Sequence, residues 1–281
     1  MTLSTETSYL RRIKTGDVEL AYTDHGTGEP ILFIHGSWDD HHSWDGVTAQ
    51  LGPDCRAITY DRRGHSASTD MPGQGHLSED VQDALDLMKE LNLGPAHIVG
   101  HSYGANIAID LAITAPQSTL SLFVLEPPLF SLLAGNEKLN ALKADSAGLM
   151  KKSAQLIMQG EIEQGARLFV EKVAFGEDSW SKVFDDAGRH TILSNVDTWL
   201  DQSRDPERLA IDITGLKDYP NRITYATGTE SLPTYKEVTK KFSEILPAAK
   251  IAPIAGGAHG SHISHPLLVA KALAAHLSEL G

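Results

Sequence analysis

The chain has 281 residues, of which 41% are hydrophobic and 22% charged, and its formal net charge is -13 at pH 7. This composition is typical of a globular protein that buries a substantial core. The negative charge repels nucleic-acid phosphates and anionic lipid surfaces, which argues against both as partners. Cys55 is the single cysteine, so no disulfide can form within the chain.

The N-terminal residues lack a basic segment followed by an apolar one, and no apolar run approaches the roughly 20 residues that span a bilayer. We therefore expect a cytoplasmic protein without a membrane or nucleic-acid partner. The expected partners are a small-molecule substrate and, at most, a second copy of the chain in a homodimer.

The first part of the chain alternates between strand-like and helix-like segments. Strands are predicted at 11–15, 18–24, 31–35, 55–61, 97–100 and 120–126. The last four are short, continuous apolar runs, which are typical of parallel strands buried on both faces. Helices are predicted from Ser78, as the N-terminal cap, to about Leu91, and from Ala105 to Ala115, where Pro116 ends the helix.

From Pro127 to about Pro220 the strand signal disappears and helical apolar stripes replace it. Strand patterns return at 222–228 and 249–256, with helices at 234–246 and from Pro266 onward. The pattern predicts an α/β protein with a mostly parallel sheet of about eight strands and helices on both faces. The expected core is 1–128 and 221–281, with a helical cap of residues 129–220 inserted after strand six.

A possible nucleophile lies where the apolar strand 97–100 turns into the next helix. Residues 100–104 read Gly-His-Ser-Tyr-Gly, an instance of the G-x-S-x-G motif. Such a turn strains the backbone and exposes the serine hydroxyl, and the helix dipole favours negative charge there. We expect Ser102 to be the nucleophile and His101 to contact the substrate.

Acyl transfer also needs N–H donors for the oxyanion. The first expected donor is the backbone N–H of Tyr103, the residue after the nucleophile. The second should come from the loop after the strand 31–35, where Ser37 follows Gly36. Trp38 is the alternative donor, and its ring is expected to line the substrate pocket.

The general base should follow the last strand, where residues 256–266 read GGAHGSHISHP. His259 comes directly after the glycine pair and is the expected base, with His262 as the alternative. Zinc binding by His259, His262 and His265 is not expected, because their spacing does not match a helical i, i+4 pair and no cysteine or carboxylate joins them. No metal and no cofactor are predicted.

Taken together, these segments resemble the α/β-hydrolase family. HGSW (35–38), DRRGHS (61–66), GHSYG and the final AHGSHISHP occur in the family's order. The resemblance covers about 20–128 and 220–281, and the block between them resembles the family's variable helical cap. It places His259 at the histidine of the usual G-H-x-x-x-x-x-x-P ending, although Ala258 replaces the glycine.

The sequence departs from the family at the triad acid. The family usually carries an aspartate after the seventh strand as G-x-x-D, but Ser231 stands at that place here. Some branches take the acid from the end of strand six, where this chain has Glu126 in VLEPP, and a glutamate there also resembles zearalenone-type lactonases. The resemblance therefore implies Glu126 as the acid, with Glu230 as the alternative.

The expected function is a serine hydrolase that cleaves a neutral, apolar carboxylic ester or lactone through an acyl-enzyme intermediate. The cap is rich in aromatic and methionine side chains, and no arginine or lysine cluster adjoins the motifs. Two alternatives stay open. One is carbon–carbon bond hydrolysis, or a cofactor-free perhydrolase or lyase, on the same triad. The other is a ligand receptor with a slow residual triad.

Overall fold

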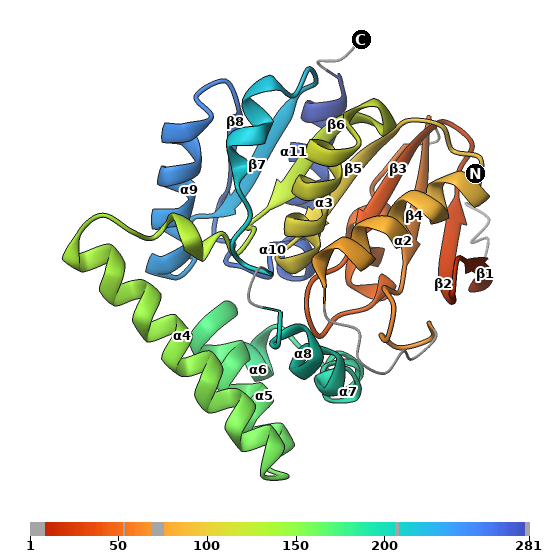
Figure 1. The fold of residues 1–281 in the computed structure, drawn as a ribbon. Helices are drawn as coiled ribbons and strands as arrows, with labels where there is room; N and C mark the ends of the chain where they lie inside the picture. The colour runs from red at the N-terminus through yellow and green to blue at the C-terminus, as the bar shows by residue number, and fades with distance from the viewer. Residues whose placement is uncertain (1–8, 53, 69–75, 206–207, 279–281) are drawn as a thin grey trace.

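A single sheet of eight strands forms the centre of the computed structural model, which describes residues 9–52, 54–68, 76–205 and 208–278. The strand order is β1-β2-β4-β3-β5-β6-β7-β8 (Figure 1). The strands are β1 (Arg11–Thr15), β2 (Val18–His25), β3 (Glu29–Ile34), β4 (Cys55–Tyr60), β5 (Ala96–His101), β6 (Thr119–Leu125), β7 (Ile223–Gly228) and β8 (Lys250–Ile254). The pairs β1–β2 and β2–β4 are antiparallel, and the other pairs are parallel. The predicted fold class is confirmed.

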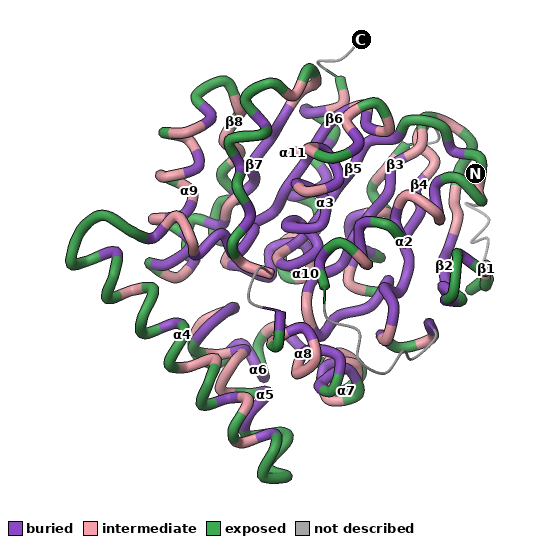
Figure 2. The backbone as a smooth tube through the Cα atoms, in the orientation of Figure 1, coloured by how far each residue is buried: buried purple, intermediate pink, exposed green. Residues whose placement is uncertain are grey.

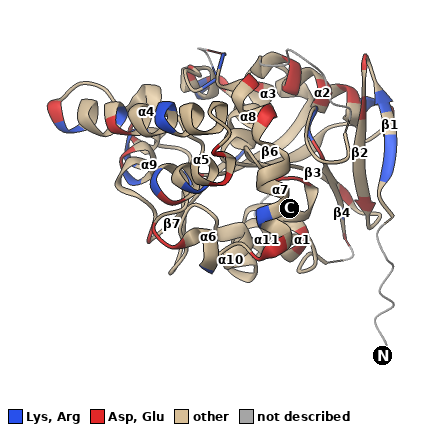
Figure 3. Ribbon diagram, turned by 90° about the horizontal axis from the view of Figure 1, so that it is seen from below, with Lys and Arg blue, Asp and Glu red and all other residues tan. Residues whose placement is uncertain are grey.

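The central strands form because their apolar runs are buried on both faces. In β3, Leu32 and Ile34 belong to the apolar cluster on one face of the sheet, whereas Ile31 and Phe33 belong to the cluster on the other. β1 lies at the edge and carries basic side chains along its length (Figure 3). Charged side chains on an edge strand discourage pairing with another chain.

Helices cover both faces of the sheet. The larger apolar cluster contains residues of α2 (Leu77–Glu90), α3 (Tyr103–Thr114) and α9 (Pro233–Ile245). The smaller cluster contains residues of α1 (Asp45–Thr48) and α11 (Pro266–Ser278). Figure 2 shows the resulting buried centre, with the central strands and α3 almost entirely inaccessible.

The N-terminus of α2 differs from the expected one. The helix begins at Leu77 with His76 at the cap position, so Ser78 lies within the first turn. The Glu79 carboxylate accepts a hydrogen bond from the His76 backbone N–H at 3.1 Å, which fixes this start. Because the Glu79 side chain satisfies the backbone N–H of His76, the helix starts after His76 and not after Ser78, the cap predicted from the sequence.

Between β6 and β7 the described residues form helices and no strand. They are η3 (Phe130–Leu132), α4 (Glu137–Met158), α5 (Ile162–Phe169), the π-helix η4 (Val170–Ala174), α6 (Ser179–Lys182), α7 (Asp186–Ser194), α8 (Val196–Gln202) and η5 (Ile213–Asp218). We call residues 129–220 the helical insertion. Its helices α4 to α8 lie together at one end of the sheet (Figure 1). Its independence as a domain stays a prediction.

The helical insertion is attached over the loops that follow β3 and β4. Asn195 donates to the Asp39 carbonyl at 3.1 Å and accepts from the Ser66 N–H at 2.9 Å, and Thr198 donates to the Gly64 carbonyl at 2.6 Å. The insertion therefore covers the carboxyl ends of the parallel strands, where ligands bind in open α/β sheets. None of the described helices is long and apolar enough to cross a membrane.

Candidate active site

The turn from β5 into α3 places Ser102 in a strained conformation, with φ 52° and ψ -121°. The two neighbouring glycines make this turn possible. A Cβ on Gly100 would lie 2.4 Å from the Gly104 carbonyl oxygen, and one on Gly104 would lie 2.3 Å from the backbone oxygens of Ile34 and His35. Contacts this short exclude any side chain. The motif thus sets the geometry of the turn and leaves the Ser102 side chain partly exposed.

Glu126 and His259 form a buried pair beside this turn. The Ser102 N–H donates to the Leu125 carbonyl at 2.9 Å, so the residue after Leu125 is held next to the elbow. Glu126 itself has φ 47°, and its Oε2 lies 3.0 Å from His259 Nδ1. The exposed Glu230 does not make this contact.

The other oxygen of Glu126 is held by three donors. Its Oε1 accepts from Thr227 Oγ1 at 2.9 Å and from the Gly228 N–H at 2.8 Å, and Ser231 Oγ also donates to it. Ser231, which stands where the family usually has its aspartate, thus supports a glutamate from the neighbouring strand. Sequence reasoning noted the missing aspartate but not this supporting role.

Burial and hydrogen bonding oppose each other at the pair. Burial alone would raise the pKa of the Glu126 carboxyl, but the hydrogen bonds from His259, Ser231 and Gly228 lower it overall. Burial lowers the pKa of the His259 imidazole, and the contact with Glu126 partly opposes this. The pair is therefore expected to hold an ionised carboxylate and a neutral imidazole near pH 7. His259 Nε2 has no hydrogen-bond partner among the described groups, so it is available to accept a proton.

Ser37 and Tyr103 lie beside Ser102, as expected for oxyanion donors. Both line the same cavity as Ser102. Tyr103 is the first residue of α3, where backbone N–H groups have no acceptor within the helix. Within the described part of the chain, neither the Ser37 N–H nor the Tyr103 N–H is used in a hydrogen bond. Two free N–H groups therefore lie near the serine.

The cavity at Ser102 has a volume of ≈ 30 Å³ and is lined in large part by the helical insertion. The insertion contributes apolar side chains, among them Phe130, Met150 and Phe169, and one cation, Arg208. Ligand pockets for small organic molecules have about 300 Å³ or more, so the side chains that line this cavity must move to admit a substrate of that size. Arg208 was not anticipated, because a single arginine far from every motif carries no signal in the sequence.

Two of the expected substrate contacts lie elsewhere. The Trp38 ring stacks on Trp199 and Phe169, with centroids 4.7 and 5.2 Å away, so it supports cavity-lining residues from behind. His101 is buried and continues the sheet face of Val99, which packs on α11, because alternate residues of a strand share one face. It does not line the cavity of Ser102, but its ring lies 4.7 Å from the His259 ring, between centroids.

One further aromatic residue joins the base to the cavity. Tyr235, at the start of α9, lines the cavity and stacks on the His259 ring with centroids 4.2 Å apart. The ring orientation of His259 is thus fixed from two sides, by Glu126 and by Tyr235. Nothing in the sequence near Tyr235 distinguishes it from an ordinary core residue of a helix.

Comparison with known proteins gives one family. A model described as the alpha/beta hydrolase family matches residues 31–272. An uncharacterized hydrolase of Bacillus subtilis, YraK, is 37% identical over 119 residues, which are 41% of this chain and 44% of that protein. The (E)-2-((N-methylformamido)methylene)succinate hydrolase of Acinetobacter baylyi is 28% identical over 160 residues, or 54% of this chain and 61% of that enzyme.

Both alignments thus span less than two thirds of the relatives' own lengths. Among solved structures, a hydrolase from Pseudomonas aeruginosa superimposes with a TM-score of 0.78 at 21% identity, covering 95% of this chain and 98% of the other. At this identity the likeness concerns the fold alone.

Proposed function

Because the chain belongs to the alpha/beta hydrolase family, we propose that it is a serine hydrolase that cleaves a carboxylic ester or lactone with an apolar acyl group. The observation that carries this proposal is the 3.0 Å contact between His259 Nδ1 and Glu126 Oε2, beside a serine on a strained strand-to-helix turn. A carboxylate at Nδ1 leaves Nε2 as the basic nitrogen.

In the proposed mechanism, Ser102 Oγ attacks the substrate carbonyl while His259 Nε2 accepts the hydroxyl proton. The free N–H groups of Ser37 and Tyr103 stabilise the oxyanion. The imidazolium then protonates the leaving alcohol, and Glu126 stabilises the positive charge without taking the proton. Water attacks the acyl-enzyme by the same sequence of proton transfers and releases the acid.

The test combines covalent labelling with a substrate panel. A fluorophosphonate probe should label the wild type and not Ser102→Ala, while Ser243→Ala, at a partly exposed serine on α9, should label normally. Nitrophenyl esters and lactones of increasing acyl length should be turned over by the wild type and Ser243→Ala alone. Labelling of a different serine would contradict the assignment. Labelling without ester or lactone turnover would favour carbon–carbon hydrolysis, perhydrolase or lyase chemistry, or a receptor.

Arg208 favours a second candidate substrate class, namely carboxylates. The expectation of a neutral substrate rests on the lack of a basic cluster near the motifs, but the Arg208 side chain lines the cavity and lies over the Trp199 ring at 5.9 Å. The Acinetobacter baylyi relative is named for a succinate derivative, which is anionic. A guanidinium in a largely apolar cavity would bind one carboxylate of such a substrate.

Two esters of similar size separate the candidates, nitrophenyl butyrate and nitrophenyl hemisuccinate. If Arg208 binds a carboxylate, Arg208→Met should raise KM for the hemisuccinate by about tenfold or more and leave the butyrate unchanged, since a hydrogen bond to a charged group contributes about 1.5–3 kcal/mol. Arg204→Met, at an exposed arginine paired with Asp201, is the control. Equal effects on both esters would leave the neutral substrate as the better candidate.

A further inference from the structure

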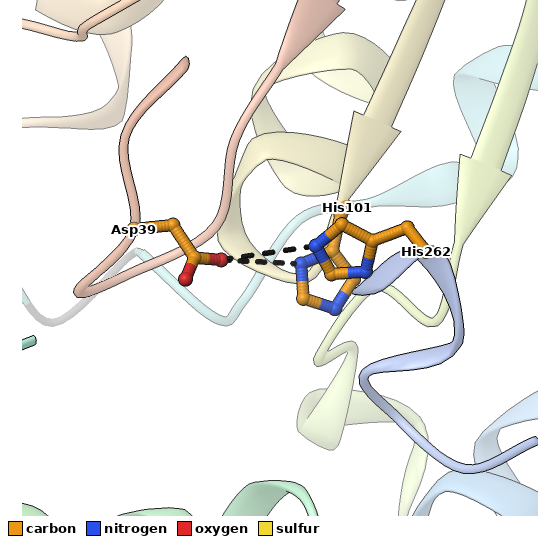
Figure 4. A group of neighbouring side chains, drawn as sticks. All are labelled: Asp39, His101 and His262. Atoms are coloured by element: carbon orange, nitrogen blue, oxygen red, sulfur yellow. Dashed lines mark ion pairs between the residues drawn. The ribbon is translucent and has the colours of Figure 1, made fainter. Parts of the chain in front are cut away.

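A second group of buried titratable side chains lies next to the candidate active site and takes no part in the proposed chemistry. Asp39 comes from the loop after β3, His101 from the end of β5, and His262 from α10 (Ser261–Ser264). Asp39 Oδ2 lies 3.7 Å from His101 Nδ1 and 3.9 Å from His262 Nε2. Figure 4 shows the carboxylate directed at both imidazole rings.

Four polar atoms of this group have no hydrogen-bond partners. Asp39 Oδ2, His101 Nδ1 and both ring nitrogens of His262 are buried and unpartnered among the described groups. Buried polar atoms without partners are costly, so a ligand that satisfies these atoms together would stabilise the protein.

The donor set matches a metal ion. The three ligand atoms lie within 4.8 Å of one another. Around a tetrahedral zinc ion with bonds of about 2.0–2.1 Å the ligand atoms would be ~3.4 Å apart, so small side-chain movements close the site. His101 Nε2 lies 2.9 Å from the His259 carbonyl oxygen, so it donates there and presents the Nδ1 lone pair to the cluster. Histidine ligands of metals are commonly oriented by such a second hydrogen bond.

An entry path leads from the surface to the cluster. A cavity of ≈ 460 Å³ lies between residues 39–46, the segment 183–191 that leads into α7, and α10, and its lining includes Asp39, Asp40, Asp185 and His262. Carboxylates along this path attract cations and would let water complete the coordination. The path is separate from the small cavity at Ser102.

We propose that Asp39, His101 and His262 bind a first-row divalent cation of the zinc class. Two imidazoles and one carboxylate suit Zn²⁺ better than Mg²⁺ or Ca²⁺, which prefer oxygen ligands. The ion would join three segments of the chain that also carry Ser37, Ser102 and His259, and would fix their relative positions. This site does not depend on the serine hydrolase proposal.

Two neighbouring groups of similar composition are weaker candidates. Asp40, His41 and Asp61 are close together, but Asp61 Oδ1 already pairs with His41 at 2.6 Å, and Asp40 Oδ1 and Oδ2 accept from the His42 N–H and the Ser66 hydroxyl. The three histidines of the 256–266 loop do not converge, since His259 is held by Glu126 and His265 Nδ1 by Ser264. Zinc binding by that trio was not expected from the sequence, and the proposed site uses a different set.

The test uses untagged full-length protein stripped with a strong chelator and titrated with Zn²⁺ against a chromophoric competitor. The wild type should bind about one ion per chain with Kd below about 1 µM, and its Tm should rise with Zn²⁺. His262→Gln and Asp39→Asn should each weaken binding by about 100-fold or more and abolish the Tm shift. His265→Gln, a histidine three residues along, should bind like the wild type.

Cobalt provides a readout that needs no variant. Co²⁺ bound by the wild type should give the intense visible bands of a four-coordinate complex. Weak bands of a six-coordinate ion would overturn the site, as would Zn²⁺ uptake below about 0.2 equivalents or His262→Gln binding with wild-type affinity. Because both arms measure metal rather than hydrolysis, failure of the metal site and failure of the proposed activity are distinguishable.

Discussion

The carboxyl edge of the sheet and the helical insertion above it are built differently. At the edge, Trp38, Ser102 and Glu126 have positive φ angles of 73°, 52° and 47°, although none is a glycine. In the described part of the insertion only Asp178, an exposed residue, has this feature among non-glycine residues. A strained backbone conformation is kept only where the surrounding structure holds the residue in place, and such residues concentrate at functional sites.

The insertion is stabilised mainly by apolar and aromatic packing. Trp38, Trp180, Phe184 and Trp199 belong to one buried cluster that joins it to the loop after β3. Apolar packing of this kind tolerates the substitution of one apolar side chain by another of similar volume. The Glu126–His259 hydrogen bond does not tolerate the replacement of either partner. We therefore expect substitutions at the sheet edge to reduce the rate, and substitutions in the insertion to change which substrates fit.

The largest effect is expected for His259→Ala. Without the base, kcat should fall by roughly 10⁴-fold or more, while the Tm changes little compared with the loss of activity. Single-turnover and steady-state rates on a nitrophenyl ester measure the loss. His265→Ala, on the same loop but held by Ser264, should retain nearly all activity. If His265→Ala or His262→Ala were the more damaging change, a different histidine would be the base.

Glu126→Gln should come next. The amide keeps the shape but favours the wrong imidazole tautomer, and kcat should fall by about 10⁴-fold, as for the analogous Asp-to-Asn change in serine proteases. Glu230→Gln is the matched control, because Glu230 is exposed and lies on the loop where the family usually carries the acid. Activity is measured for both variants under one set of conditions. A large loss in Glu230→Gln with a small one in Glu126→Gln would move the acid to that loop.

The pH dependence of kcat/KM tests the same pair with a smaller effect. The base must be neutral, and burial lowers the pKa of His259 below the ordinary value of 6.5. Activity should therefore persist below pH 6.5 and fall only when the imidazole becomes protonated. Because the contact with Glu126 raises this pKa, Glu126→Gln should move the acidic limb to still lower pH. An acidic limb above pH 6.5 in the wild type would be incompatible with a desolvated base.

The smallest effect is expected in the insertion. Met150 lines the cavity, whereas Met158 on the same helix α4 is 68% exposed. Met150→Ala should favour longer acyl chains, with a gain in kcat/KM of about fourfold for each additional buried CH₂, and should leave acetate esters nearly unchanged. Met158→Ala should keep the wild-type chain-length profile. A drop of several orders of magnitude for Met150→Ala on every ester would contradict the division between the two regions.

The sequence by itself determined the sheet and the elbow. The apolar runs of the central strands and the two glycines around Ser102 act through local geometry, since strand burial and a turn without room for Cβ atoms require those residue types. The pairing of Glu126 with His259 was also accessible, because strand ends of a parallel sheet meet at one edge. The replacement of the usual aspartate by Ser231 pointed to the same glutamate.

Only the tertiary structure decided what surrounds these residues. Arg208 and Tyr235 reach the cavity because the insertion and α9 fold back over the sheet, and no local pattern encodes where such long-range contacts fall. His101 was expected to contact the substrate; in the structure it is absent from the lining of the Ser102 cavity and meets Asp39 and His262. Residues 39, 101 and 262 are far apart in the sequence, so their convergence depends on the packing of three separate loops against one another.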